Sequence, residues 1–167
     1  MRLTQWTDYA LRVLMYCAAC EGRGQPVTIS EVAAAHQISR SHLTKIVQQL
    51  AAQGFLDTTR GRGGGMRLMK PANAINLGAV VRVTEPDFAM VECFNPAQDT
   101  CRLSSHCGLK GVLGRATAAY LGVLDALTLA DLVPETVTPL MGADGQPLWL
   151  VPGLPASPQV FARQNPS

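Results

Sequence analysis

The sequence predicts a mainly α-helical protein with one small β-hairpin. Three observations predict this fold class. Two short helical patterns meet at a tight turn within residues 28–53, two short extended runs joined by glycines occupy residues 55–70, and a long helical pattern begins after residue 108. A helix pair followed by a hairpin is the arrangement of a winged helix-turn-helix, and a long apolar-striped helix behind it suits dimerisation.

The composition is that of a folded chain without a membrane span. The chain has 167 residues, of which 47% are hydrophobic and 16% charged, so it can bury a core and is too apolar for a disordered protein. No apolar run reaches the roughly 18 residues of a membrane span. No secretory signal is evident, so we expect cytoplasmic residence and no membrane partner. Five cysteines in a reducing compartment favour free thiols or metal ligands over disulfides.

Charge is distributed unevenly along the chain. Residues 1–82 carry ten Lys and Arg against four Asp and Glu, whereas residues 83–167 carry four against eight. A basic N-terminal part joined to an acidic remainder is the electrostatic pattern expected of a nucleic-acid binder.

The first helix is expected from Thr4 to Cys20, because apolar residues recur there at steps of three and four. Asp8 and Arg12 lie four residues apart on one face, and this spacing favours a surface salt bridge. Cys17 and Cys20 form a C-x-x-C within the helical pattern, without the βαβ context of a thioredoxin-like motif. We interpret both as small core residues.

A helix-turn-helix is predicted next. Thr28 and Glu31 form a capping box that begins a helix ending at His36, and Ser39 caps a second helix that runs to about Gln53. The second helix has one apolar face, and its opposite face can donate to phosphates or to purine edges in a major groove. The predicted DNA-binding residues of this segment are Ser39, Arg40, Ser41, Thr44, Lys45 and Gln48.

The hairpin that follows is predicted to be a basic wing. Its strands are expected at residues 55–60 and 66–70, on either side of the segment GRGGG at 61–65. Glycines let the backbone approach a phosphate chain closely, and guanidinium groups can enter a minor groove. The segment lacks the G-x-x-x-x-G-K-[ST] pattern of a nucleotide-binding loop. The wing residues predicted to contact double-stranded DNA are Arg60, Arg62, Gly63, Gly64 and Arg67.

The predicted domain organisation has four parts. Residues 1–85 form the winged helix-turn-helix domain, closed by a helix that Asn76 caps and that runs from Leu77 to about Glu85. Residues 86–108 are a loop, 109–133 a dimerisation segment with one continuous helix from about Leu109 to Leu132, and 134–167 a proline-rich tail. A long helix with a wide apolar stripe needs a partner surface, and a second copy of the chain is the simplest one.

Three cysteines lie in the predicted loop, at Cys93, Cys101 and Cys107. Thiols this close together on a pliable loop can converge on one point, as soft-metal and iron–sulfur sites require. From the residues alone, these cysteines are either cofactor ligands or buried thiols.

Several segments together resemble bacterial winged-helix regulators of the Rrf2 family. The similar segments are LTQWTDYALR at 3–12, ISRSHLTK at 38–45, GRGGGMRL at 61–68, INLG at 75–78 and GLKGVL at 108–113, together with the three loop cysteines. The resemblance covers residues 1 to about 133 and leaves out the tail. It implies a transcriptional regulator that is not an enzyme and whose cysteines hold an iron–sulfur cluster.

Within the family, the fourth ligand distinguishes the cluster types. One branch has a histidine three residues after the third cysteine, where this chain has Lys110, and His106 is not at that position. The nitric-oxide-sensing branch uses three cysteines and an aspartate from the other subunit, and this chain is similar to it at Asp8. The gap between the first two cysteines, seven residues here, is longer than is common in that branch.

The resemblance therefore implies a specific ligand set. The ligands are Cys93, Cys101, Cys107 and the partner's Asp8. They hold one [4Fe–4S] cluster per subunit, in preference to a [2Fe–2S] cluster. Arg12 and Glu85 are expected to form a pair that orients Asp8.

The implied function is that of a homodimeric repressor that senses nitric oxide and releases DNA when its cluster is nitrosylated. Three alternatives stay open. The cluster can report iron supply or redox state, or the cysteines of a DNA-binding protein can be structural, bind zinc or form a thiol switch. A small redox enzyme or electron carrier is the third alternative, but it would not need a basic wing.

Overall fold

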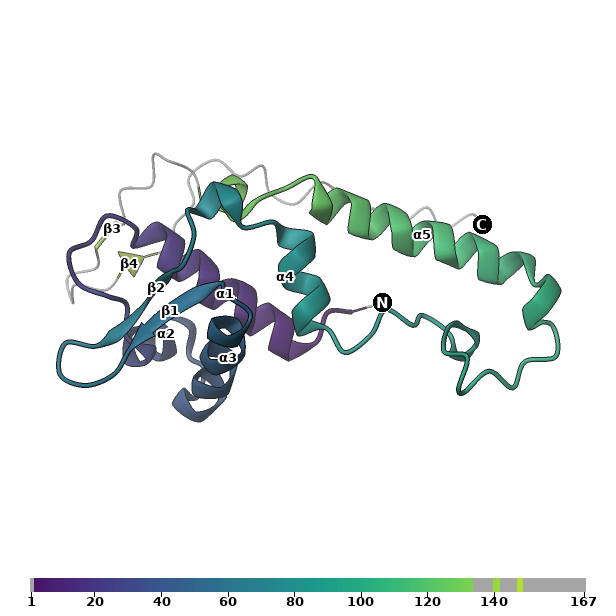
Figure 1. Cartoon of the computed structure of the whole chain (residues 1–167), viewed down its shortest axis with the longest axis horizontal. Helices are drawn as coiled ribbons and strands as arrows, with labels where there is room; N and C mark the ends of the chain where they lie inside the picture. The colour runs from purple at the N-terminus through teal and green to yellow at the C-terminus, as the bar shows by residue number, and fades with distance from the viewer. Residues whose placement is uncertain (1, 134–139, 142–146, 149–167) are drawn as a thin grey trace, which may run out of the picture.

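The computed structural model describes residues 2–133, 140–141 and 147–148. Figure 1 shows a winged unit, built from α1 to α4 and the β1–β2 hairpin, from which a long arm extends. The arm consists of α5 and of the loop that leads to it, and the two run side by side away from the winged unit. Among the described residues, no helix is long and apolar enough to cross a membrane.

Helix α1, Gln5–Ala19, lies at the centre of the winged unit. Thr4 caps it by accepting a hydrogen bond from Thr7 N at 3.3 Å, as the short hydroxyl side chains favoured at this position do. Its inward face places Ala10, Val13 and Leu14 at zero exposure. The helix that the sequence predicted between Thr4 and Cys20 is therefore confirmed.

Helices α2, Ile29–His36, and α3, Arg40–Ala52, form the predicted helix-turn-helix. The capping box of Thr28 and Glu31 is present, with Glu31 Oε2 accepting from Thr28 N at 2.6 Å. Gln37 ends α2 in the left-handed region at φ 55°, and Ser39 begins α3 by accepting from His42 N at 3.4 Å. These contacts between sequence neighbours confirm the two predicted boundaries.

The wing is an antiparallel hairpin of β1, Leu56–Thr59, and β2, Gly65–Leu68. Its strands are shorter than the sequence predicted. Arg60 belongs to the turn at the tip, in which Gly61 and Gly63 have positive φ, and at the other end of the hairpin β1 begins at Leu56 and β2 ends at Leu68. A backbone pair joins Val27 to Met66, which is 2% exposed, and so fixes the wing to the segment before α2.

One core joins the elements of the winged unit. Its largest fully buried side chains come from α1, α3, both strands, the segment before α4 and the segment after α5. They include Leu14, Tyr16, Leu43, Ile46, Leu50, Leu56, Met66, Ile75 and Leu129.

Helix α4, Leu77–Thr84, begins at Asn76, whose side chain accepts from Ala79 N at 3.0 Å, as predicted. Helix α5, Gly108–Asp125, ends before Leu132, so the predicted continuous helix is wrong. Asn76 Nδ2 donates to the carbonyls of Asp125, at 2.7 Å, and Leu127, at 3.2 Å. The chain then forms a separate 3-10 turn, Leu129–Leu132.

This interruption attaches the arm to the winged unit. Leu77 N donates to Leu127 O at 3.0 Å and Leu129 N donates to Ile75 O at 2.8 Å, and Leu129 is completely buried. Burial of Leu129 and pairing of these backbone groups favour the turn over a straight helix that would lead the chain away from the core.

A side-chain pair holds α4 against α5. Arg82 contacts both carboxylate oxygens of Asp125, at 2.5 and 2.7 Å, in the two-pronged geometry that suits a guanidinium and a carboxylate. Gly78 lies beneath this pair, and a Cβ atom added there would overlap Asp125 Oδ1. A glycine at this position therefore lets the two helices approach.

Most of the predicted tail, residues 134–167, lies outside the described residues. The described part is an antiparallel pair of two-residue strands, β3, Leu140–Met141, and β4, Pro147–Leu148.

We expect Gly78→Ala to lower the stability by up to about 1 kcal/mol relative to Gly122→Ala, because the added methyl group displaces the exposed ends of Asp125 and Arg82 and weakens their ion pair. Thermal unfolding followed by circular dichroism measures the loss. Gly122→Ala is the matched control, since no atom lies within 4 Å of its added Cβ. It should keep or raise the stability, and equal losses in both variants would contradict the packing argument.

Candidate nucleic-acid interface and cysteine loop

The polar face of α3 is open to solvent. All six residues predicted there are exposed, namely Ser39, Arg40, Ser41, Thr44, Lys45 and Gln48. Two of them also serve the helix itself, since Ser39 is its N-cap and Thr44 Oγ1 donates to Arg40 O at 2.8 Å. Arg40, Lys45 and Gln48 extend the longest polar side chains from this surface, which matches the donor set used to read base edges.

The wing presents Arg60, Arg62 and Gly63 as exposed residues at its tip. Gly64 has a structural role, because its N–H donates to Gly61 O at 3.0 Å and an added Cβ would overlap Thr59 O. These positions are compatible with the predicted DNA contacts, which stay predictions.

Arg67 differs from the other wing arginines in what it contacts. Its guanidinium donates to Arg23 O at 3.1 Å and to Gly24 O at 2.5 Å, which ties β2 to the loop after α1. Arg23 in turn pairs with Glu31 at 2.8 Å. In this arrangement Arg67 links the wing to the loop after α1, and two of its donors are used within the chain.

The three loop cysteines differ in their surroundings. Cys93 is 9% exposed and lies in a 3-10 turn, Glu92–Phe94. Cys101 is exposed, and Cys107 is half-buried at the residue that precedes α5. Within the described residues, no three His, Cys, Asp or Glu side chains are placed together as a metal-holding group.

Polar bonds hold the loop in this conformation. Asp99 accepts from Cys101 N at 3.1 Å and from the Ser104 hydroxyl, and Lys110 donates to Ser104 Oγ at 2.8 Å from the first turns of α5. Hydrogen bonding to Ser104 is the main cause that lowers the pKa of Asp99. This set of contacts was not predicted from the sequence, because it depends on how the loop folds back onto Lys110 of α5.

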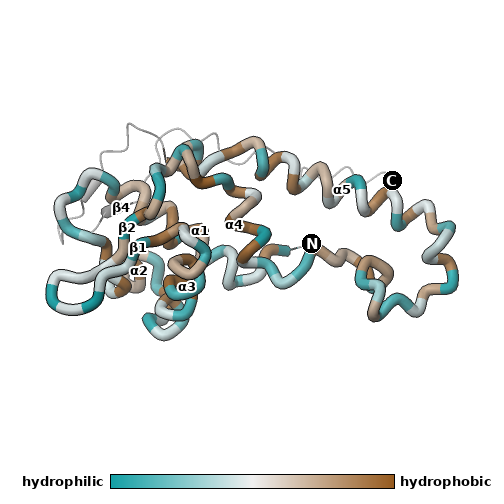
Figure 2. The backbone as a smooth tube through the Cα atoms, in the orientation of Figure 1, coloured by the Kyte–Doolittle hydropathy of each residue, from teal (hydrophilic) through white to brown (hydrophobic). Residues whose placement is uncertain are grey.

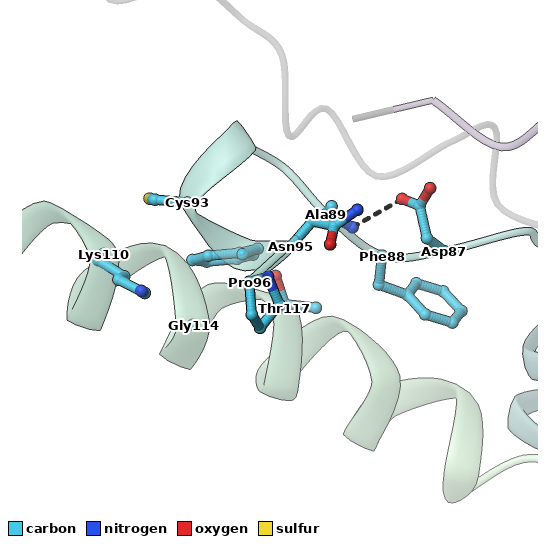
Figure 3. Close-up of a pocket in the computed structure, with 10 residues that line it drawn as sticks. Asp87, Phe88, Ala89, Cys93, Asn95, Pro96, Lys110, Gly114 and Thr117 are labelled. Atoms are coloured by element: carbon cyan, nitrogen blue, oxygen red, sulfur yellow. Dashed lines mark hydrogen bonds between the residues drawn. The ribbon is translucent and has the colours of Figure 1, made fainter. Parts of the chain in front are cut away.

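Beside Cys93, the loop and α5 enclose a groove of about 720 Å³ (Figure 3). The loop contributes Phe88, Asn95 and Pro96, and α5 contributes Lys110 and Thr117, among others. Three thiols on one loop fit an iron–sulfur cluster by their chemistry. The described chain does not assemble them, so the loop has to rearrange before all three thiols can bind one cofactor.

Asp8 and Arg12 form the surface pair that their spacing predicted. Arg12 Nη2 lies 3.0 Å from Asp8 Oδ2, and both side chains are 45% exposed. The expected Arg12–Glu85 pair is not formed within the described chain. Glu85 Oε1 instead accepts from Thr4 N at 2.8 Å and Thr4 Oγ1 at 3.1 Å. Because Thr4 caps α1, Glu85 fixes the helix end that carries Asp8 and does not contact Arg12.

Cys17 is a core residue, as predicted, whereas Cys20 is half-buried and packs against the core. Cys17 is 4% exposed, and burial raises the pKa of its thiol to about 12. Burial also raises the pKa of the half-buried Cys20 thiol. Both cysteines are therefore protonated and poorly reactive at neutral pH, since the thiolate is the reactive form.

Comparison with known proteins assigns the family. The sequence profile of Rrf2, described as "Iron-dependent Transcriptional regulator", matches residues 3–135. The chain belongs to the Rrf2 family. Among curated relatives it is similar to the HTH-type transcriptional regulator NsrR of Bacillus subtilis (strain 168), with 50% identity over 133 residues that cover 80% of this chain and 90% of that protein.

Two further comparisons agree with the Rrf2 assignment. NsrR of Bacillus licheniformis is 47% identical over 133 residues, which cover 80% of this chain and 92% of that protein. The solved structure of CymR (YrzC), the global cysteine regulator of B. subtilis, superposes with a TM-score of 0.64 at 25% identity, covering 79% of this chain and 95% of CymR.

These findings confirm the predicted fold and the class of function. The chain is a winged helix-turn-helix transcriptional regulator of the Rrf2 family, and the names of its relatives confirm that it is not an enzyme.

We expect Arg62→Ala to weaken DNA binding by a similar factor on every sequence and to lower the salt slope of log K by about one. The reason is that we expect the exposed guanidinium at the wing tip to contact phosphates. Lys45→Ala and Gln48→Ala should instead relax sequence preference, because their side chains point from the reading face of α3. Binding to specific and scrambled duplexes across a salt series measures both effects. An unchanged salt slope for Arg62→Ala would count against the wing contact.

Proposed function

We propose that this chain is a homodimeric repressor that binds one [4Fe–4S] cluster per subunit, senses nitric oxide through it and leaves DNA when nitric oxide reacts with the cluster. Cys93, Cys101 and Cys107 are the proposed ligands of one protomer, and the partner's Asp8 is the fourth. The observation that carries the proposal is the presence of three thiols on the loop between α4 and α5, together with the exposed carboxylate of Asp8 on α1.

The donor set supports an iron–sulfur cofactor. Thiolates are the usual ligands of such clusters, and the three loop thiols lie outside the core that holds Cys17. The identity with proteins named NsrR, together with the iron-dependent description of the Rrf2 family, supports the same assignment. When bound, the cluster supplies iron that can react with nitric oxide.

The exposed arm supports a homodimer. Helix α5 has no buried residue, and Leu109, Val112 and Val123 are 62%, 50% and 62% exposed. Figure 2 shows apolar positions distributed along α5, which extends away from the winged unit beyond its C-terminal contact with α4. Burying such side chains stabilises a protein by about 1.5–3 kcal/mol each, so a second copy packed on this helix would supply what the single chain lacks.

The surface position of Asp8 supports its role as a ligand shared between subunits. Its partner within the chain is Arg12, in an i, i+4 pair with both side chains 45% exposed. Exposed pairs of this kind contribute well under about 1 kcal/mol, so Asp8 can exchange Arg12 for another partner at little cost. A carboxylate is a harder ligand than the three thiolates, and Asp8 is therefore the ligand that we expect to be released first.

Protein purified without oxygen should be brown and carry iron and sulfide, because three thiolates and a carboxylate complete a cluster site. Titration with nitric oxide should bleach the colour and weaken binding to operator DNA in parallel. Absorbance spectroscopy and gel-shift assays on the same samples measure both. Colourless protein that carries zinc would instead favour structural cysteines, and loss of DNA binding on iron depletion or oxidation alone would favour an iron or redox signal.

Substitutions test whether the loop cysteines, and not Cys17 and Cys20, bind the cofactor. Cys93→Ala, Cys101→Ala or Cys107→Ala should abolish cofactor binding. Cys17→Ala and Cys20→Ala are matched controls that should retain the cofactor, because those thiols lie in or beside the core of the winged unit.

Mixed dimers test whether Asp8 acts across the subunit interface. One protomer carries Asp8→Ala, and the other carries Cys93→Ala, Cys101→Ala and Cys107→Ala. If the partner donates Asp8, this heterodimer has one complete site and should hold half the iron of the wild-type dimer with wild-type stability towards oxygen. The Asp8→Ala homodimer is the reference and should lose its cluster faster. A heterodimer that behaves like this reference would place Asp8 and the cysteines of each site in the same chain.

A further inference from the structure

The side chain of Gln49 lies where three helices of the winged unit meet. Its Oε1 accepts a hydrogen bond from the indole N–H of Trp6 on α1, and its Nε2 donates to Val83 O on α4 at 2.7 Å. Gln49 itself belongs to α3, the helix that carries the predicted DNA-reading face. One amide therefore joins α1, α3 and α4.

These contacts close into a ring through the end of α4. Glu85, two residues after Val83, accepts from Thr4 N and Oγ1 at the start of α1. Thr4 O in turn accepts from Asp8 N at 3.1 Å. The turn of α1 that carries both Trp6 and Asp8 is thus linked to α3 directly through Gln49 and to α4 through Glu85.

Trp6 also contacts α3 at a second point. The ring of His42 meets those of Trp6 and Tyr9 edge-on, with centroid separations of 6.4 and 6.0 Å. His42 and Gln49 lie two helical turns apart, about 10 Å along the axis of α3. A helix held at two points along its length cannot pivot against α1 without breaking one of them.

The partial burial of this contact makes its loss costly. Trp6, Gln49 and Val83 are all half-buried. If α1 moved away from α3, the half-buried amide of Gln49 would lose both partners at once, and a polar group shielded from water is destabilised when it has no partner. We therefore expect α3 to move together with Trp6, because this movement keeps both hydrogen bonds of Gln49.

We propose that Gln49 is a positioning residue that makes the orientation of α3 depend on the first turns of α1. It reads no DNA sequence itself. When Asp8 leaves Arg12 and binds the cluster of the partner subunit, we expect that end of α1 to move. Trp6 and Gln49 transmit this movement to the DNA-reading face of α3. The regulatory consequence rests on the proposed function, whereas the positioning role does not.

Gln49→Leu tests the inference, because leucine keeps the size and helix propensity of the side chain and removes both hydrogen bonds. The measured quantity is the ratio of specific-DNA affinities between cofactor-loaded and cofactor-free protein. We expect this ratio to fall by about 3- to 10-fold, which corresponds to one or two neutral hydrogen bonds. Trp6→Phe, which keeps an aromatic ring at this position and removes the N–H donor, should lower the ratio in the same direction.

A spectroscopic readout accompanies the affinities. In the nitrogen–proton correlation NMR spectrum of the cofactor-free protein, the indole signal that Trp6→Phe deletes belongs to Trp6. This N–H should exchange with solvent slowly in the wild type and faster in Gln49→Leu, since its acceptor is gone.

Gln5→Leu is the matched control. It removes a glutamine hydrogen bond of similar length, from Gln5 Nε2 to the Tyr9 hydroxyl at 2.8 Å, which lies within α1 and joins no other helix. The affinity ratio and the Trp6 exchange rate should both stay at their wild-type values.

The outcomes distinguish this inference from the proposed function. A folded Gln49→Leu protein with the wild-type ratio overturns the inference, and so does an equal effect of Gln5→Leu. If Gln49→Leu does not fold, Trp6→Phe decides in its place. If the wild-type protein itself has an affinity ratio of one, the proposed function is contradicted. The positioning role is then decided by the affinity for specific DNA alone, which should fall in Gln49→Leu and not in Gln5→Leu.

Discussion

The packing of α1 against its neighbours is the interaction on which the rest of the fold depends. Its fully buried face, formed by residues such as Ala10, Val13 and Leu14, contacts α2, α3, α4, β2 and the 3-10 turn that follows α5. Contacts with α1 therefore position both parts of the predicted DNA surface, the exposed face of α3 and the wing. The recognition face of α3 is held near the start of α1 by Trp6, and the wing is held near its end, where Arg67 donates to the carbonyls of the loop after α1. A displacement at either end of α1 would therefore change the geometry of the predicted DNA surface.

The winged unit and the arm are stabilised by different means. The winged unit buries a continuous apolar core, whereas α5 has no buried residue and is attached at its C-terminal end through Asp125, Leu127 and Leu129. The cysteine loop relies on short polar turns, of which those around Asp99 are the most connected. Segments with few buried contacts open at low free-energy cost. This is the property that a loop needs if three separated thiols are to gather around one cofactor.

Particular residues show how far sequence reasoning reaches. Thr28, Ser39 and Asn76 were predicted as helix caps and act as such, because a cap depends on residues two or three positions away. The end of α5 was predicted wrongly, because the residue that interrupts the helix is Asn76, far away in the sequence. For the same reason Glu85 was predicted to pair with Arg12, whereas in the fold it holds Thr4. The three loop cysteines were identified from their spacing, but spacing alone does not show whether the loop brings their thiols together.

The sequence by itself determined the class of this protein. Periodicity, caps, turn glycines and the order of elements specify a winged helix-turn-helix with a long helix behind it, because these signals act between residues close in the chain. The tertiary structure decided which polar side chains are free to bind and which hold the fold. Arg62 and Arg67 are both exposed wing arginines, yet Arg62 lies at the tip, whereas Arg67 donates to the carbonyls of Arg23 and Gly24 in the loop after α1. Likewise Gln48 and Gln49 are adjacent and chemically identical, but only Gln49 is turned towards Trp6 and Val83. The physical reason is that a donor or acceptor binds whatever the fold places within reach, and for long polar side chains that partner comes from a distant part of the chain.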